Sequence, residues 1–166
     1  MRVRVGTKSG HAGAAAVHEH LDRLGVHYQA IDHESTFTAA NEAAASGVAP
    51  HEALKTLVVH DRQHRLALVA LPASERLDLN KVRELLNDRS LELATELELA
   101  RALPRYDVGA VPLLGPGVPR LVLLDERVPK HSRVVCSAGD HRHALALSPE
   151  ELIRAAKPCI ADICEE

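Results

Sequence analysis

The sequence predicts a single α+β domain, in which helices surround a mixed, largely antiparallel and partly barrel-like sheet of about six strands. Two nearly continuous apolar runs, residues 56–60 and 65–71, are joined by a short polar segment, which is typical of a hairpin buried on both faces. Helical apolar spacing and capping residues recur between the other short apolar runs. The length of 166 residues favours one domain.

The N-terminal half has four further predicted elements. Apolar residues at helical spacing over Ala12–Leu24, followed by Gly25, predict the first helix. Alternation over residues 27–32 predicts a short strand. The alanine-rich residues 38–46 predict a second helix, and residues 51–54 a short helical turn before the hairpin. Residues 1–11 carry little pattern and are expected to be a flexible tail, which leaves 12–166 as the domain.

Capping signals define the helices of the C-terminal half. Asp78 precedes a predicted helix over 79–87, the capping box Thr95-x-x-Glu98 one over 97–103, and Ser148-Pro149-x-Glu151 a last one. Short apolar runs predict strands at 121–124, 134–135 and 143–147.

Composition excludes several classes of protein. With 2% aromatic residues the chain has no ladder of rings for stacking single-stranded bases. A net charge of −3 lacks the basic excess of a protein held on nucleic acid by phosphate contacts alone. Three cysteines give no even disulfide framework and favour a reducing compartment. Without a recognisable signal or membrane-spanning segment, the sequence predicts a cytoplasmic protein that binds no membrane.

Two features could carry chemistry. Lys55 stands at the start of a buried apolar run, where an ammonium group needs a partner or an anionic ligand. The plain alternative is a lysine whose stem is buried and whose charge reaches solvent. The segment 109–119 holds three Gly and three Pro, and such a rigid loop can leave backbone groups free for a small ligand or be a simple connection.

A metal site is a weaker hypothesis. Cys136, His141 and His143 lie close in sequence, but residues two apart on a strand point to opposite faces, which disfavours shared ligation. Cys136 follows two valines, which favours a buried, inert thiol over a nucleophile. We therefore expect no metal and no organic cofactor.

The order of short motifs resembles the YbaK and prolyl-tRNA synthetase-associated editing domain family of free-standing aminoacyl-tRNA deacylases. The resemblance runs from about Val17 to Ile153. It rests on the segments 55–58 (KTLV), 68–74 (LVALPAS), 93–98 (LATELE), 109–112 (GAVP), 124–126 (LDE) and 137–141 (SAGDH).

The resemblance implies hydrolysis of the ester between an amino acid and the terminal ribose of a mischarged tRNA, such as Ala-tRNA(Pro) or Cys-tRNA(Pro). It implies catalytic roles for Lys55 and Gly109. The substrate-binding residues that it implies are Thr36, Ala110, Val111, Pro112, Gly139, Asp140 and His141. Expected partners are the aminoacyl-tRNA acceptor end and prolyl-tRNA synthetase or another synthetase, and the expected state is a monomer or weak dimer.

One position departs from the family pattern. Family loops commonly place a proline four residues after the glycine, where this chain has Leu113, with Pro112 one residue earlier. The departure keeps a second hypothesis open, in which the protein binds tRNA or a synthetase without hydrolysing an ester. A metal-dependent hydrolase is the third hypothesis.

Overall fold

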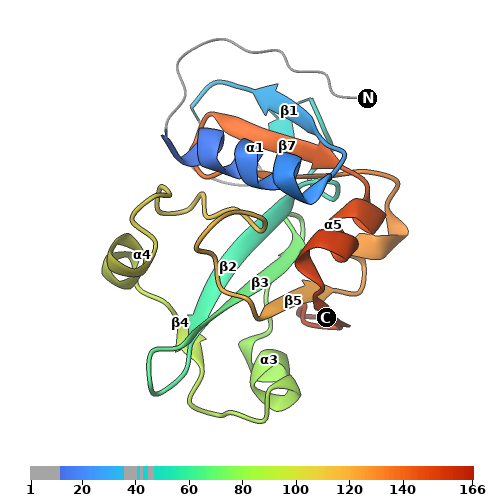
Figure 1. Ribbon diagram of the computed structural model, residues 1–166. Helices are drawn as coiled ribbons and strands as arrows, with labels where there is room; N and C mark the ends of the chain where they lie inside the picture. Colours follow the sequence, from blue (N-terminus) through green and yellow to red (C-terminus); the bar gives the residue numbers. More distant parts are fainter. Residues whose placement is uncertain (1–11, 36–40, 42, 45–46) are drawn as a thin grey trace.

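The computed structural model describes residues 12–35, 41, 43–44 and 47–166 (Figure 1). In chain order the elements are α1 (Ala12–Leu24), β1 (Gln29–Asp32), β2 (Leu54–His60), β3 (Leu66–Pro72), α3 (Leu79–Leu85), β4 (Glu92–Leu93), α4 (Glu96–Ala102), β5 (Val122–Asp125), η1 (Val128–Lys130), β6 (Val134–Ser137), β7 (His143–Leu147), α5 (Pro149–Ala156) and β8 (Cys159–Ala161).

The strands form two sheets where the sequence predicted one. The smaller sheet has the order β1-β7-β6 and is antiparallel throughout. The larger has the order β4-β2-β3-β5-β8, in which β5 pairs in parallel with both β3 and β8. A bridge between Ala53 and Val135 connects the two sheets just before β2. The predicted α+β class with mixed, largely antiparallel strands is confirmed, and the sheets do not close into a barrel.

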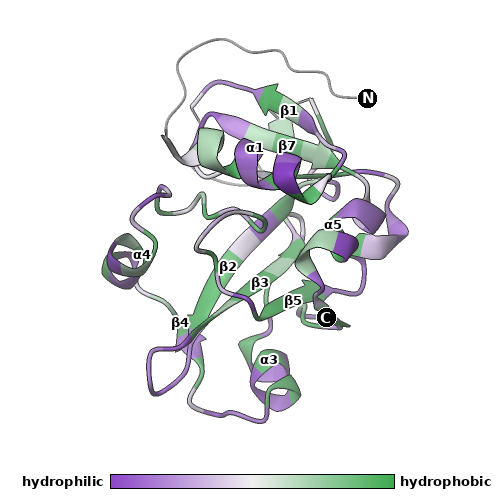
Figure 2. Ribbon diagram, viewed as in Figure 1, coloured by the Kyte–Doolittle hydropathy of each residue, from purple (hydrophilic) through white to green (hydrophobic). Residues whose placement is uncertain are grey.

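The predicted hairpin is confirmed as β2 and β3, which pair from Leu54 opposite Pro72 to His60 opposite Leu66. Burial on both faces is also confirmed. Val58 and Leu68 pack in the main core with α1, α5 and the smaller sheet, whereas Val59 and Val69 pack with α3 and the C-terminal segment. Much of β2 and β5 is coloured hydrophobic in Figure 2 for this reason.

The capping predictions are confirmed. The Asp78 side chain accepts from the amides of Asn80 and Lys81 at the start of α3, and Thr95 forms a full capping box at the start of α4. Ser148 caps α5. Gly25 follows α1 with φ +67°, the left-handed conformation that ends many helices.

Three predictions concern the chain before β2. The helix predicted over residues 38–46 lies largely outside the described residues, as does the predicted tail over 1–11. The short helical turn predicted over 51–54 lies slightly earlier: the amides of Glu52 and Ala53 both donate to the Ala49 carbonyl oxygen, and Leu54 already belongs to β2. Leu54 is 4% exposed and pairs with Pro72, so strand pairing and burial decide its conformation.

No helix among the described residues is long and apolar enough to cross a membrane.

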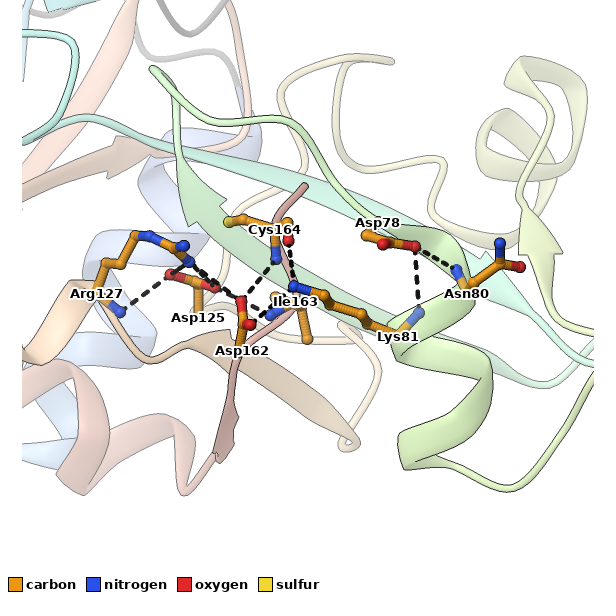
Figure 3. A network of polar contacts seen from close by, with 8 residues as sticks. All are labelled: Asp78, Asn80, Lys81, Asp125, Arg127, Asp162, Ile163 and Cys164. Atoms are coloured by element: carbon orange, nitrogen blue, oxygen red, sulfur yellow. Dashed lines mark hydrogen bonds and ion pairs between the residues drawn. The ribbon is translucent and has the colours of Figure 1, made fainter. Parts of the chain in front are cut away.

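A polar network fastens the C-terminal segment to the larger sheet (Figure 3). Asp125, at the end of β5, is fully buried and accepts hydrogen bonds from the Ile163 amide at 3.1 Å and from the Arg127 guanidinium. Asp162 lies between two cations, with Lys81 Nζ at 2.8 Å and Arg127 Nη1 at 3.3 Å. These contacts join β5, α3 and the chain end, which are far apart in sequence.

The three cysteines differ in burial, and we expect their reactivities to differ accordingly. Cys136 and Cys164 are buried, and Cys159 is exposed on β8. Burial and a hydrogen bond to Asp125 raise the pKa of Cys164 to about 12, so its thiolate is scarce at neutral pH. We expect a thiol reagent to modify one cysteine per folded chain, at Cys159, and all three after denaturation. Mass spectrometry of the labelled peptides checks this; modification of Cys164 in the folded protein would contradict it.

Candidate functional site

A loop that follows α4 carries four of the nine predicted site residues, namely Gly109, Ala110, Val111 and Pro112. Gly109 has φ +83°, a left-handed conformation that glycine adopts without steric cost. From Ala110 to Gly115 the chain is buried against the main core. Among the backbone amides of residues 109–115, only that of Ala110 donates a described hydrogen bond, to the Asp107 carbonyl oxygen at 3.0 Å. The amides of Gly109 and Val111 donate none of the described hydrogen bonds.

The turn between β6 and β7 lies against this loop. Ser137 Oγ is 3.0 Å from the carbonyl oxygen of Ala110 and 3.4 Å from that of Asp140. The Asp107 amide donates to the Gly139 carbonyl oxygen at 2.9 Å. Two segments about thirty residues apart, which the sequence predicted separately, are thus held together through Ser137.

Tyr106 supports both segments. Its hydroxyl donates to the Pro116 carbonyl oxygen at 2.5 Å, beyond the buried part of the loop. A Cβ atom built on Gly139 would lie 2.7 Å from the Tyr106 ring, and one on Gly115 would lie 2.7 Å from its hydroxyl. Burial raises the pKa of Tyr106, so the phenol remains protonated and keeps this donor. Tyr106 was not predicted as a site residue, and Ser137 was named only as part of the segment 137–141; one of only two tyrosines beside a glycine-rich loop was the available signal for Tyr106.

Asp140 stabilises the turn from inside. It is 2% exposed, and its carboxylate accepts from the Arg142 amide at 2.8 Å and faces His143 Nδ1 at 2.7 Å. His143 Nε2 lies 3.5 Å from Asp32 of β1. These contacts tie the turn to the smaller sheet and occupy the Asp140 side chain. His141, in the same turn, is half-buried.

Lys55 is half-buried in β2, directly opposite Leu71 of β3. Among the described residues no carboxylate forms an ion pair with its ammonium group, and no hydrogen bond joins it to the Gly109 loop. Thr36 lies outside the described residues.

Leu113, at the position where family loops have proline, is 2% exposed and packs in the main core. It also lines the wall of a surface hollow of about 480 Å³ between the second half of the loop and the end of α5. Arg120 and Lys157 stand at this hollow, so its lining includes two cations. The departure from the family pattern therefore changes a packed position of the loop and not an exposed one.

The residues of the metal hypothesis are not gathered as ligands. Cys136 is buried in the main core, and His143 is committed to Asp140 and Asp32. Among the described residues, the one group of His, Cys, Asp or Glu at ligand spacing lies elsewhere. The described residues form an α+β fold in which the Gly109 loop and the β6–β7 turn are held against each other.

Comparison with known families agrees with this class. The sequence profile of the aminoacyl-tRNA editing domain matches residues 33–155, which is most of the chain. The protein belongs to the aminoacyl-tRNA editing domain family, as the motif order indicated. A search of curated proteins gave no match.

Solved structures agree in fold over nearly the whole chain. One is described as a candidate trans-editing enzyme for prolyl tRNA synthetase, with a TM-score of 0.86 and 26% identity over 96% of this chain and 100% of that one. The hypothetical protein APE2540 gives a TM-score of 0.81 and 29% identity over 90% of this chain and 99% of that one. A third, from work on computational epitope grafting onto scaffold proteins, gives a TM-score of 0.83 and 26% identity over 93% and 97%.

Proposed function

We propose that the protein is a trans-editing hydrolase that cleaves the aminoacyl ester of mischarged tRNA, with Ala-tRNA(Pro) and Cys-tRNA(Pro) as the first substrates to test. Family membership and the likeness to a protein described as a trans-editing enzyme support this class of reaction. The observation that carries the proposal is the Gly109 loop, whose unused amides are suited to a carbonyl that becomes an oxyanion.

Water attacks the ester carbonyl carbon, either directly or activated by the neighbouring ribose hydroxyl of the substrate. The acyl C–O bond then breaks, which releases the amino acid and a tRNA with a free terminal hydroxyl. The amides of Gly109 and Val111 would donate to the developing oxyanion, and a loop carbonyl would hold the water or the α-ammonium group. Ala110, Val111 and Pro112 would form the apolar wall beside the acyl group, because they are buried and continuous with the core.

Lys55 would anchor the terminal nucleotide through its phosphate or through the charge that develops at the ester. A half-buried ammonium group without a described carboxylate partner suits this role. In the β6–β7 turn, Gly139 and His141 would contact the substrate, and Asp140 would act by holding the turn in place. Thr36 is proposed as a substrate contact from the family resemblance alone.

The acceptor end of tRNA also needs phosphate contacts. Arg101 at the end of α4 and Arg105 just before the loop are exposed, and both precede Gly109 in the chain by fewer than ten residues. By contrast, Arg133 is paired with Glu52, and Arg76 lies 3.7 Å from Glu165. We propose Arg101 and Arg105 as local contacts to the acceptor stem, since a net charge of −3 offers no general attraction to RNA.

Deacylation of a panel of aminoacyl-tRNAs tests the proposal. We expect wild-type protein to hydrolyse some members, including Ala-tRNA(Pro) or Cys-tRNA(Pro), and Lys55→Ala to lower kcat/KM by about 100-fold because one charge that stabilises the transition state is lost. Lys130→Ala is the matched control, because this lysine is exposed on η1 and should leave the rate unchanged.

A panel in which every ester survives, while aminoacyl-tRNA or a synthetase still binds, would overturn the hydrolase and favour the binding module. Leu113 is the observation behind that second candidate, because it replaces the family proline inside the loop. Equal rates for Lys55→Ala and Lys130→Ala would instead retain the hydrolase and remove Lys55 from its mechanism.

A further inference from the structure

His60, His64 and Glu98 form a three-ligand cluster between the β2–β3 hairpin and the start of α4. One nitrogen from each imidazole and one carboxylate oxygen lie within 4.8 Å of one another. His60 ends β2, His64 lies in the β2–β3 hairpin loop, and Glu98 is in the first turn of α4. We propose that this cluster binds a divalent transition metal ion, and that Zn²⁺ is its ligand.

Each side chain is positioned by its own local structure. Asp61 fixes the hairpin loop by accepting from the amides of Gln63 and Arg65 at 2.8 and 2.9 Å, and His64 takes a left-handed φ of +61° within it. The capping box at Thr95 holds Glu98, whose backbone amide donates to Thr95 Oγ1 at 3.1 Å. The hairpin loop that carries His64 and the first turn of α4 that carries Glu98 are therefore fixed by their own hydrogen bonds, which lowers the entropic cost of binding a metal ion.

The hydrogen bond of His60 assigns its tautomer. Nδ1 lies 2.9 Å from the Asp61 carbonyl oxygen, which can only accept, so Nδ1 carries the hydrogen. Nε2 of a neutral His60 then presents a lone pair to Glu98 Oε1 at 3.7 Å. Nε2 and Oε1 are thus two acceptor atoms that face each other, an arrangement that a shared metal ion, or a proton on Nε2, would stabilise. A backbone carbonyl that orients the imidazole in this way is usual for a zinc-bound histidine.

The second histidine completes the set. His64 Nδ1 lies 3.3 Å from Glu98 Oε2, and the two imidazole rings stack with their centroids 5.2 Å apart. Two imidazoles and one carboxylate are the ligands of many zinc sites that keep a fourth position open. The side chains of His60 and Glu98 are 14% and 21% exposed, and that of His64 is 73% exposed, so an ion can enter from solvent on the His64 side.

Bound metal would fasten α4 to the hairpin. No residue of α4 is buried, and Leu97 on this helix is 60% exposed, so the helix has few apolar contacts of its own. A surface hollow of about 620 Å³ adjoins the cluster and is lined in part by Leu66, Leu97 and Arg101. Because α4 leads into the Gly109 loop, a metal here would stabilise the approach to the loop without taking part in ester hydrolysis.

Zinc titration of the full chain by calorimetry tests this inference. We expect one Zn²⁺ per wild-type chain, and a loss of affinity of at least about 10-fold in both Glu98→Gln and His64→Ala. Glu98→Gln keeps the capping box, since glutamine serves in it as glutamate does, and removes the charged ligand. Zn²⁺ should also raise the Tm of the wild type more than that of either variant.

The control is His51→Ala. His51 and His131 are a second pair of imidazole rings, with centroids 5.3 Å apart, and this variant should bind Zn²⁺ as the wild type does. With 11 histidines in the chain, scattered surface binding would give affinities that respond equally to all three variants. That result, or binding in Glu98→Gln equal to the wild type, would overturn the site and leave the proposed hydrolase untouched.

Discussion

Gly139→Ala is expected to lower the free energy of unfolding by about 2 to 4 kcal/mol, because it combines backbone strain with overpacking. Gly139 has φ +104°, a conformation that side-chain-bearing residues rarely adopt. A Cβ atom there would lie 2.7 Å from Cδ1 and 3.2 Å from Cε1 of Tyr106. The ring cannot move away easily, because Tyr106 is 5% exposed and its hydroxyl is bonded to Pro116. Urea unfolding measures the change.

Gly117→Ala separates the two causes. Gly117 also has a left-handed φ, of +76°, but no atom lies within 4 Å of its Cβ position. This variant should therefore lose only the backbone contribution, about 1 kcal/mol. Equal losses in the two variants would mean that the Tyr106 contact does not restrain the turn. If the contact does restrain it, Gly139→Ala should also lower deacylation at temperatures where both variants remain folded.

Part of the fold could be predicted from the sequence alone. Local signals were sufficient for α1 with its terminal Gly25, for the Thr95 capping box and for the β2–β3 hairpin, because each depends on residues close together in the chain. They placed the end of the short turn before β2 too late, because Leu54 is buried and paired with Pro72 as the first residue of β2. Long-range pairing overrode the local preference there.

Some features of the candidate site could likewise be predicted from the sequence, and others could not. The glycine-rich loop, Lys55 and the β6–β7 turn could be selected from motif order. The contacts that stabilise the loop and hold it to the turn could not, because Tyr106 and Ser137 reach their partners across 10 and 27 residues and the motifs imply no role for either residue. The division into two sheets was missed for a related reason: strand pairing partners such as β1 and β7 are more than a hundred residues apart.

Asp125→Ala is expected to cost about 3 kcal/mol, the lower end of the range for breaking a buried ion pair. The lower end applies because Arg127 is 36% exposed and can regain water, whereas the Ile163 amide loses its acceptor. Glu126→Gln is the matched control, since this neighbouring carboxylate is exposed and should change stability little. Urea unfolding at neutral pH compares them, and equal stabilities would show that the network does not fasten the C-terminal segment.

The acid dependence of stability gives the same network an independent test. Burial acts to raise the pKa of Asp125, but hydrogen bonds from the backbone of Arg127 and Ile163, from Cys164 and from the guanidinium outweigh it and lower the pKa below its ordinary value of 3.8. The Asp125 carboxylate therefore binds a proton more readily in the unfolded chain than in the folded one. Its contribution to stability is fully present above the pKa that it has in the unfolded chain, and is lost as the pH falls through its lower pKa in the folded chain. Unfolding free energies measured from pH 6 down to about pH 3 should thus fall more steeply for the wild type and Glu126→Gln than for Asp125→Asn, which has no carboxyl group to protonate at this position. If the unfolding free energy of Asp125→Asn falls with pH in parallel with that of the wild type, other carboxylates cause the acid sensitivity. A smaller fall in this variant would show that Asp125, at the end of β5, causes it.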